Sequence, residues 1–173
     1  MVTGGVTSAR PHWPRAGYHF ETKGEFWLVG LGSCGPYKQA REWVLPLWEA
    51  LLRRQHELPP VVDRSVYVSP YHGRETEFTC YVGLAAREEV VDLPPGMRCI
   101  RIPTHTYAVG SVRGSRAEID EVYRTLPEWA EAQGRRPDKG SLWLEIHPQA
   151  PTHAPHAPPC FDVYLPVLPL GWH

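Results

Sequence analysis

The chain of 173 residues contains no run of about eighteen consecutive apolar residues, the length that a membrane-spanning helix requires. Its eighteen basic residues are balanced by nineteen acidic ones, so we expect no basic surface field that would hold a nucleic-acid backbone. The sequence also lacks a glycine-rich phosphate loop and a serine nucleophile elbow. We therefore expect neither membrane insertion nor direct DNA binding, and no cofactor is predicted.

Cysteine is scarce, with four residues and no C-x-x-C spacing. Each cysteine lies in or beside an apolar run, which predicts buried, reduced thiols and a cytoplasmic location. The first sixteen residues contain no apolar stretch of the kind that a secretory signal needs. His153 and His156, together with Cys160, are residue types that bind metals, but no fourth ligand stands at a set spacing, so no metal site is predicted. The cysteines are Cys34, Cys80, Cys99 and Cys160.

Proline and aromatic residues are abundant, with nineteen Pro, seven Trp and eight Tyr. The prolines separate short elements, whereas the aromatic residues need a core or a ligand to cover them. Apolar residues recur at helical spacing in Lys38–His56 and in Arg116–Gln133. Segments rich in β-branched and aromatic residues predict strands at Tyr18–Lys23, Phe26–Gly32, Ser65–Tyr71, Glu77–Ala86, Cys99–Arg113, Leu142–His147 and Cys160–Val167.

The order strand, helix, strand, strand occurs twice and predicts an internal repeat. Leu-Pro-Leu-Trp at residues 45–48 returns as Leu-Pro-Glu-Trp at 126–129, and Val29-Gly30 returns as Val109-Gly110 at nearly the same offset. The matching prolines predict a kink or a helix boundary that both halves share. We predict an α+β fold of duplicated β-α-β-β units with pseudo-twofold symmetry, both helices on one face of an antiparallel sheet, and a ligand cleft between the halves. The expected divisions are an extended segment at 1–17, one domain at 18–168 with repeats at 18–90 and 97–168, and a tail at 169–173.

Alternation along the strands indicates which side chains share a face of the sheet. In Leu142–His147 the alternate residues from Leu142 are apolar and suit the core, so Glu145 and its aromatic neighbours are expected on the helix-free face. Aromatic rings around a carboxylate suit flat organic cations, because ring faces attract positive charge. The residues expected on the free face are Tyr67, Tyr71, Tyr81, Trp143, Glu145, His147 and Tyr164, and Trp48 on the first helix is a further candidate wall.

The same aromatic pattern is also compatible with roles that involve no ligand. The rings would suit packing beneath a loop or at a dimer interface, with Glu145 satisfied by arginine or backbone donors. A one-residue shift in strand register would exchange the two faces of the sheet. The pattern by itself leaves these alternatives open.

Seven short segments follow one another along the chain: Trp27-Leu28-Val29-Gly30-Leu31, Leu45-Pro46-Leu47-Trp48, Phe78-Thr79-Cys80-Tyr81-Val82-Gly83, Pro94-Pro95-Gly96-Met97, Ile102-Pro103 with Tyr107-Ala108-Val109, Leu144-Glu145-Ile146, and Phe161-Asp162-Val163-Tyr164-Leu165-Pro166-Val167. Together they resemble the GyrI-like small-molecule-binding domain, which is also the effector-binding domain of bacterial transcription activators. The resemblance extends from about Tyr18 to Leu168. It implies a duplicated β-α-β-β fold and a pocket for lipophilic, often cationic compounds.

The resemblance also implies a ligand-anchoring glutamate at the base of the pocket, and Glu145 occupies the matching position. The tyrosine expected two residues later is His147 in this chain, a change that could alter the charge of the pocket near neutral pH. Regulator members of the family carry a fused helix-turn-helix. The matched region leaves too few flanking residues for such a module, so we expect no direct DNA binding.

Three functions are compatible with these observations. The favoured one is binding of lipophilic, cationic or planar aromatic molecules, with Glu145 as counter-charge. The second is hydrolysis of cyclopropane-bearing electrophiles, with Glu145 activating water and Tyr67 or His147 donating a hydrogen bond to the developing anion. The third, an interaction module that acts on DNA gyrase, rests on family analogy alone. No oligomeric state is predicted.

Overall fold

The computed structural model describes residues 17–60, 62–73, 77–151 and 158–171. The extended segment expected at residues 1–17 lies outside this description except for Gly17, as do His153 and His156. The strands are β1 (His19–Lys23), β2 (Phe26–Pro36), β3 (Val62–Gly73), β4 (Glu77–Ala86), β5 (Arg98–Ile102), β6 (His105–Arg113), β7 (Trp143–His147) and β8 (Cys160–Pro166). The helices are α1 (Ala40–Arg54) and α2 (Arg116–Ala132), and 3₁₀ turns at Tyr37–Gln39 and Gln55–Glu57 flank α1.

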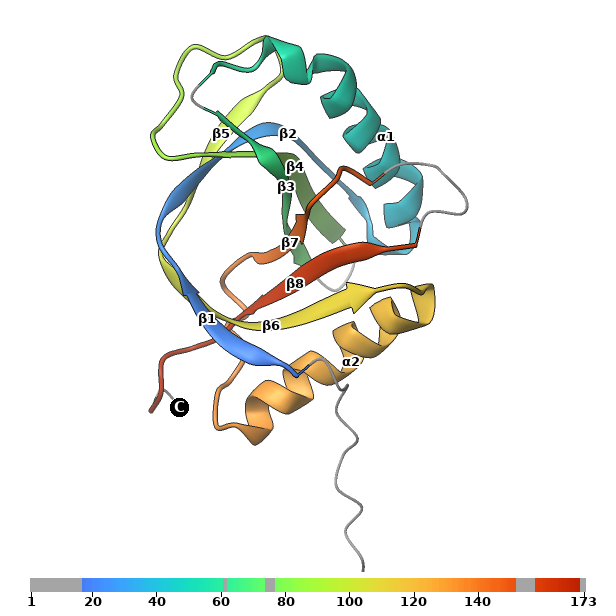
Figure 1. Cartoon of the computed structure of the whole chain (residues 1–173), viewed down its shortest axis with the longest axis vertical. Helices are drawn as coiled ribbons and strands as arrows, with labels where there is room; N and C mark the ends of the chain where they lie inside the picture. Colours follow the sequence, from blue (N-terminus) through green and yellow to red (C-terminus); the bar gives the residue numbers. More distant parts are fainter. Residues whose placement is uncertain (1–16, 61, 74–76, 152–157, 172–173) are drawn as a thin grey trace, which may run out of the picture.

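The described strands form one antiparallel sheet in the order β1-β6-β8-β7-β3-β4-β2-β5. Outward from the central β7–β3 pair, the order is β7-β8-β6 on one side and β3-β4-β2 on the other, which are equivalent positions in the two halves. The sheet curls on itself (Figure 1). Glu25, which precedes β2, forms an ion pair with Arg101 on the neighbouring strand β5, with 2.5 Å between nitrogen and oxygen. This topology confirms the α+β class, whereas the duplication of the sequence stays a prediction.

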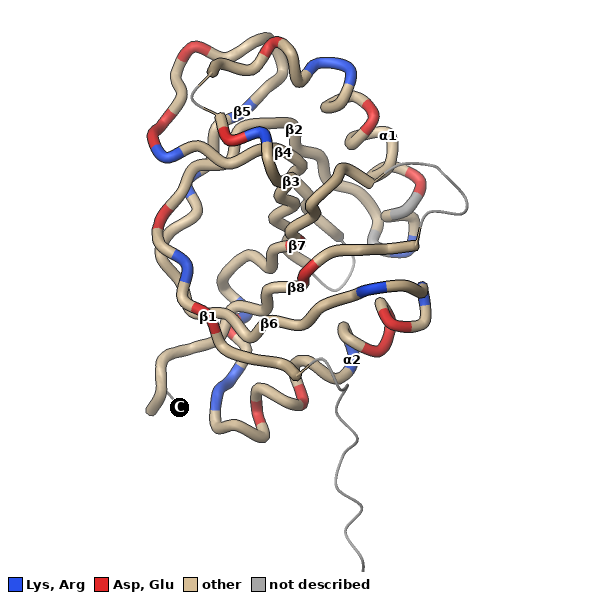
Figure 2. The backbone as a smooth tube through the Cα atoms, viewed as in Figure 1, with Lys and Arg blue, Asp and Glu red and all other residues tan. Residues whose placement is uncertain are grey.

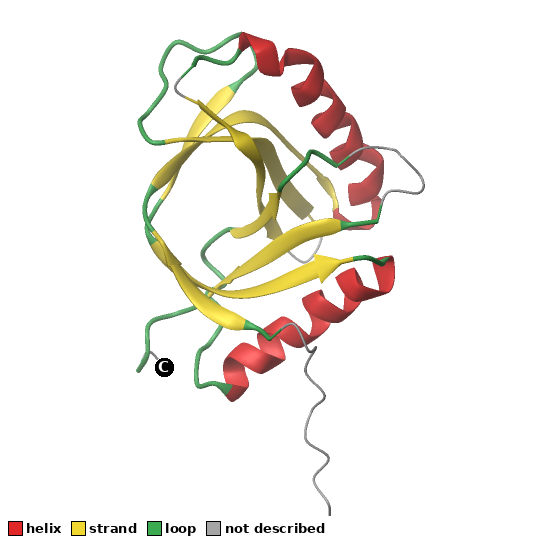
Figure 3. Cartoon of the chain, viewed as in Figure 1, coloured by secondary structure: helices red, strands yellow, loops and turns green. Residues whose placement is uncertain are grey.

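Both helices lie on the outer side of the curl (Figure 3). Helix α1 packs over β2 and β4, and α2 packs over β6 and β8, so the expectation of helices on one face is confirmed. The N-cap of α2 is Ser115, whose hydroxyl accepts a hydrogen bond from the Glu118 amide at 3.3 Å. Pro46 and Pro127 both lie inside the helices, so of the two expected alternatives the helix boundary is excluded, and the shared kink stays a prediction. Neither helix is long and apolar enough to cross a bilayer.

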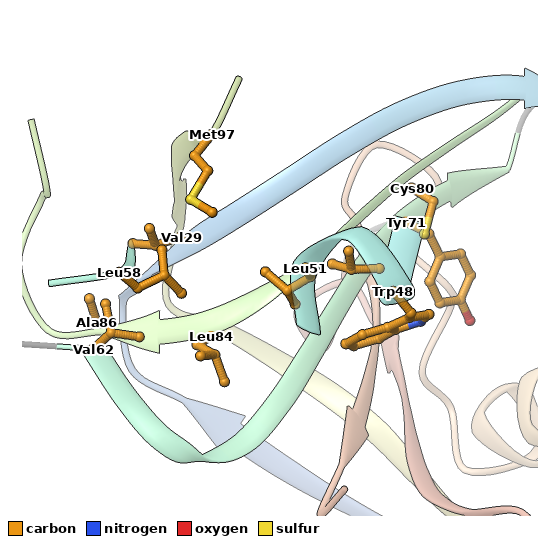
Figure 4. Packing of buried hydrophobic residues seen from close by; sticks show 11 residues of the cluster. Val29, Trp48, Leu51, Leu58, Val62, Tyr71, Cys80, Leu84, Ala86 and Met97 are labelled. Carbon is orange, nitrogen blue, oxygen red and sulfur yellow. The ribbon is translucent and has the colours of Figure 1, made fainter. Parts of the chain in front are cut away.

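Apolar side chains cover both faces of the sheet. On the outer face, Trp48 and Leu51 extend from α1 onto the strands, near Tyr71 and Cys80 (Figure 4). The inner face carries a separate core, in which Leu144 of the central strand β7 is fully buried. That core consists of Leu28, Val68, Ile102, Tyr107, Val109, Leu144 and Tyr164. Because side chains fill the inner face, it is not the open ligand face that the alternation of β7 predicted.

Strands β2 and β4 approach each other closely at a pair of glycines. Gly30 and Gly83 are opposite one another in the antiparallel register. A Cβ atom on Gly30 would lie 2.0 Å from the carbonyl oxygen of Val82 and 2.7 Å from Cα of Gly83. The backbone geometry at this point of the sheet therefore excludes a side chain.

Acidic and basic residues are interspersed over the described part of the chain (Figure 2).

The prediction of buried cysteines was right for Cys80, which is buried, and wrong for Cys34 and Cys160, which are exposed; Cys99 is half-buried. Cys160 is the first residue of β8, and Cys34 lies near the end of β2. An apolar neighbourhood in the sequence does not bury a residue at a strand end.

Candidate functional site

The three alternating residues Trp143, Glu145 and His147 of β7 share one face of the sheet, as expected. That face is the outer one, between the two helices. Trp143 packs against two clusters of buried side chains on the outer face, one beneath α1 and one beneath α2. The centre of the His147 ring lies 5.5 Å from that of the Trp48 ring on α1. The prediction that these side chains point to the helix-free face was therefore wrong.

The reason lies in the position of β7 at the centre of the sheet. Leu144 packs in the inner core, so the apolar residues that were assigned to the helix side face the interior of the curl instead. Strand β3 pairs with β7 and is inverted in the same way, with Tyr67 opposite His147 and Tyr71 opposite Trp143. Where both faces of a strand are covered, apolar alternation does not identify the face that meets a helix.

Tyr81 and Tyr164 do not join this group. Both tyrosines belong to the inner core, on the other side of the sheet. The Tyr164 hydroxyl donates to Glu21 Oε2 at 3.2 Å, and Lys23 Nζ lies 5.0 Å from the centre of the Tyr164 ring. Burial, followed by the charge of Glu21, raises the pKa of Tyr164 above its usual value. The structure thus brings together five of the seven residues that were expected on one face.

A chain of hydrogen bonds passes through the carboxylate of Glu145. The Tyr71 hydroxyl donates to the Tyr123 hydroxyl at 2.5 Å, and the Tyr123 hydroxyl donates to Glu145 Oε1 at 2.5 Å. The other carboxylate oxygen, Oε2, lies 3.2 Å from Nε2 of His147. In the described part of the chain, no lysine or arginine forms an ion pair with Glu145. Its negative charge is therefore hydrogen-bonded by the neutral phenol of Tyr123 but is not balanced by a permanent cation.

Aromatic rings surround this carboxylate. Tyr123 of α2 stacks on Trp143 with ring centres 5.6 Å apart and planes 20° from parallel, and Tyr71 lies 6.0 Å from the same indole. Trp48 makes an edge contact with Tyr67 at 6.0 Å. We refer to these residues as the Glu145 cluster: Trp48, Tyr67, Tyr71, Tyr123, Trp143, Glu145 and His147.

Burial differs sharply within the Glu145 cluster. The Trp48 residue is 2% exposed and the His147 side chain 7% exposed, whereas 24% of the Glu145 side chain is exposed. The Tyr67 hydroxyl donates to Gln55 Oε1 at 2.9 Å, at the end of α1, instead of to the carboxylate. The phenol that contacts Glu145 is therefore Tyr123 and not Tyr67.

The neighbouring hydroxyl and thiol groups are held in their neutral forms. Burial, with a further contribution from the charge of Glu145, raises the pKa of Tyr123 well above its usual value. Burial likewise raises the pKa of the Cys80 thiol to about 12, again with a contribution from Glu145. Tyr123 therefore stays a hydrogen-bond donor to the carboxylate at physiological pH, and Cys80 is a poor nucleophile.

Tyr123 is a residue of the site that the sequence pattern did not indicate. It lies on the apolar stripe of the second predicted helix, beside Val122 and Leu126, where the spacing indicates a core position. A signal was available, because a buried tyrosine needs a partner for its hydroxyl group, and the apolar stripe supplied none. The pairing with Glu145 still required knowledge of which strand lies beneath that part of α2.

The cavities described for the molecule lie away from the Glu145 cluster. One, of about 660 Å³, is lined by residues 89–91 and 93–100 between β4 and β5. The other, of about 360 Å³, is lined by Thr22, Thr104–Thr106, Arg135, Val167, Pro169 and Leu170. Neither has a residue of the cluster in its wall.

Comparison with known proteins identifies the fold. A family model described as an integron-associated effector binding protein, Cass2, matches residues 19–167. No curated protein matches the sequence.

Solved structures with similar folds share little sequence with the chain. SAV2435, in a structure bound to tetraphenylphosphonium, has 12% identity and a TM-score of 0.63 over 88% of this chain and 94% of that chain. The C-terminal domain of EcmrR has 13% identity and a TM-score of 0.64 over 88% and 97%. An integron cassette protein of Vibrio cholerae has 11% identity and a TM-score of 0.56 over 88% and 96%. At these identities the likeness shows the fold.

Proposed function

From the premise that the chain belongs to the Cass2 family of integron-associated effector-binding proteins, we propose that it binds lipophilic cations and planar aromatic molecules at the Glu145 cluster. The observation that carries the proposal is a partly exposed carboxylate with no permanent cationic partner among the described residues. A bound cation would supply the missing charge. Tetraphenylphosphonium in the structure of SAV2435 is a ligand of this kind.

The surrounding rings support the choice of ligand class. A cation placed over an aromatic face gains about 0.5–2 kcal/mol per ring, with the larger values in desolvated sites. Trp143 and Tyr71 lie within contact distance of each other beside the carboxylate, and Trp143 is only half-buried. We assign Trp143 as the principal stacking wall. Tyr67 is a further wall, with the buried Trp48 packed edge-on against it. Tyr81 and Tyr164 have no part in this site because they belong to the inner core.

The test is a fluorescence titration with a cationic rhodamine. Glu145→Gln keeps the size and the hydrogen-bond acceptor of the side chain but removes its charge, and we expect the affinity to fall about tenfold or more, which corresponds to about 1.4 kcal/mol per factor of ten. Glu128→Gln is the matched control, because Glu128 is an exposed acid on α2 and the change in net charge is the same. Equal affinities of wild type and Glu145→Gln would remove the proposed anchor.

A second candidate function is favoured by the contact between Glu145 and His147. A carboxylate 3.2 Å from an imidazole can share a proton with it and could activate a water molecule against a strained electrophile. Hydrolysis of a cyclopropane-bearing compound adds the mass of one water to it, and this gain should be lost in Glu145→Gln. Mass spectrometry after incubation distinguishes the two functions, because a binding protein returns the compound unchanged.

A further inference from the structure

His147 is a buried imidazole in contact with the carboxylate of the Glu145 cluster. Its side chain is 7% exposed, and its Nε2 lies 3.2 Å from Glu145 Oε2. The rings of Phe161 at 4.8 Å and Trp48 at 5.5 Å enclose it. We propose that His147 determines the ligand charge that the site accepts: cations bind while the imidazole is neutral and are rejected when it is protonated, whereas neutral aromatic molecules bind in both states. This inference rests on the proposed binding of ligands at Glu145.

The charge balance at Glu145 is the basis of the inference. A neutral imidazole with its hydrogen on Nε2 donates a hydrogen bond to Oε2 but brings no charge, and the same holds for the Tyr123 hydroxyl on Oε1. The carboxylate then keeps a full negative charge for a cation to neutralise. A protonated imidazole would instead form an internal ion pair with Glu145. A second cation beside that pair gains little attraction from the carboxylate and is repelled by the imidazolium.

The proton and the ligand therefore compete. If protonation of His147 weakens cation binding by a certain factor, a bound cation weakens proton binding to His147 by the same factor. At any pH where His147 is protonated in the free protein, cation binding should release a proton. A neutral aromatic ligand avoids this competition, because it needs the rings of the cluster and no unpaired carboxylate.

The other titratable groups around the His147–Glu145 pair are not expected to release a proton when the cation binds. Tyr123 from α2 and Cys80 from β4 have pKa values raised by burial, so both stay neutral where imidazoles titrate. Tyr67 from β3 is a phenol bonded to Gln55, and Phe161 and Trp48 carry no charge. Glu49, next to Trp48 on α1, is half-buried and has an interaction of its own. It is unchanged in a His147 variant, so a comparison with wild type isolates the imidazole.

The experiment is isothermal titration with two probes of similar shape, the cation tetraphenylphosphonium and the neutral triphenylphosphine oxide. Over a series from about pH 8 to pH 5, we expect wild type to lose affinity for the cation, by up to about tenfold per pH unit where the imidazole is protonated, and to keep its affinity for the neutral probe. His147→Gln should bind the cation with an affinity that hardly changes over this range. Buffers of different ionisation enthalpy should report proton release in wild type and none in the variant.

The outcomes separate this inference from the proposed function. The same pH slope in wild type and in His147→Gln, or a flat profile in wild type, would overturn the role of His147. A cation that fails to bind at about pH 8, or that binds Glu145→Gln as tightly as wild type, would overturn the binding site itself. If His147→Gln does not fold, an NMR titration of wild type decides the matter. Saturating cation should lower the pH midpoint of the His147 resonance, and an unmoved midpoint would contradict the inference.

Discussion

The hydroxyl group of Tyr123 connects α2 to the central strand, and its removal tests the geometry of the Glu145 cluster most directly. In Tyr123→Phe the ring contacts with Trp143 and Tyr71 are kept, while the hydrogen bond to the Glu145 carboxylate and the bond from the Tyr71 hydroxyl are lost. A hydrogen bond to a charged group contributes about 1.5–3 kcal/mol, and a bond between neutral groups about 0.5–1.5 kcal/mol. The two contributions added together give the loss of unfolding free energy that would follow if water replaced neither bond.

Partial exposure of Glu145 reduces the expected loss, because water can replace the missing phenol at the carboxylate. We therefore expect Tyr123→Phe to lower the free energy of unfolding by about 2 kcal/mol, the lower end of the combined range. For a protein of this length, such a loss corresponds to a fall in melting temperature of about 4–8 °C. Urea unfolding monitored by circular dichroism measures the free energy directly.

Tyr67→Phe is the matched control. It removes the same atom from a neighbouring tyrosine of the same cluster, but the lost bond is to the neutral amide of Gln55. The expected cost is about 1 kcal/mol or less. If Tyr123→Phe proved as stable as wild type, or if the two variants lost equal stability, the bond between the phenol and the carboxylate would not stabilise the fold in the way that its geometry indicates.

Two further predictions concern stability. Gly30→Ala places a Cβ atom 2.0 Å from the Val82 carbonyl oxygen, so the backbones of β2 and β4 must separate. We expect the free energy of unfolding in urea to fall by about 1–3 kcal/mol or more. Gly24→Ala is the control, because its Cβ meets nothing within 4 Å, and it should lose almost no stability. Burial raises the pKa values of Cys80 and Tyr107 to about 12 from ordinary values of 9.0 and 10.0. Folding favours the neutral forms, so the stability they contribute is full below the ordinary values and disappears as the pH rises toward 12. Unfolding free energies that stayed constant across this alkaline range would contradict the burial of these groups.

The sequence was sufficient for the order and the type of most elements. Helical spacing of apolar residues predicted the two helices to within a few residues of Ala40–Arg54 and Arg116–Ala132. One predicted strand, Cys99–Arg113, is divided in the structure into β5 and β6. Pro103, which follows β5, lies at this division, and the continuous β-rich composition obscured it. These local properties can be predicted from the sequence, because they depend on neighbours within a few residues.

The residues that form the site could be predicted only in part from the sequence. Because strand residues alternate, the sequence alone determined that Trp143, Glu145 and His147 share a face. It did not determine which face that is, because both faces of β7 are covered, and the inner core accepts Leu144 as readily as a helix would. The tertiary structure made this choice when the sheet curled and enclosed an inner core. The same folding event brought Tyr123 to Glu145 across 22 residues of chain, a contact that no local pattern encodes.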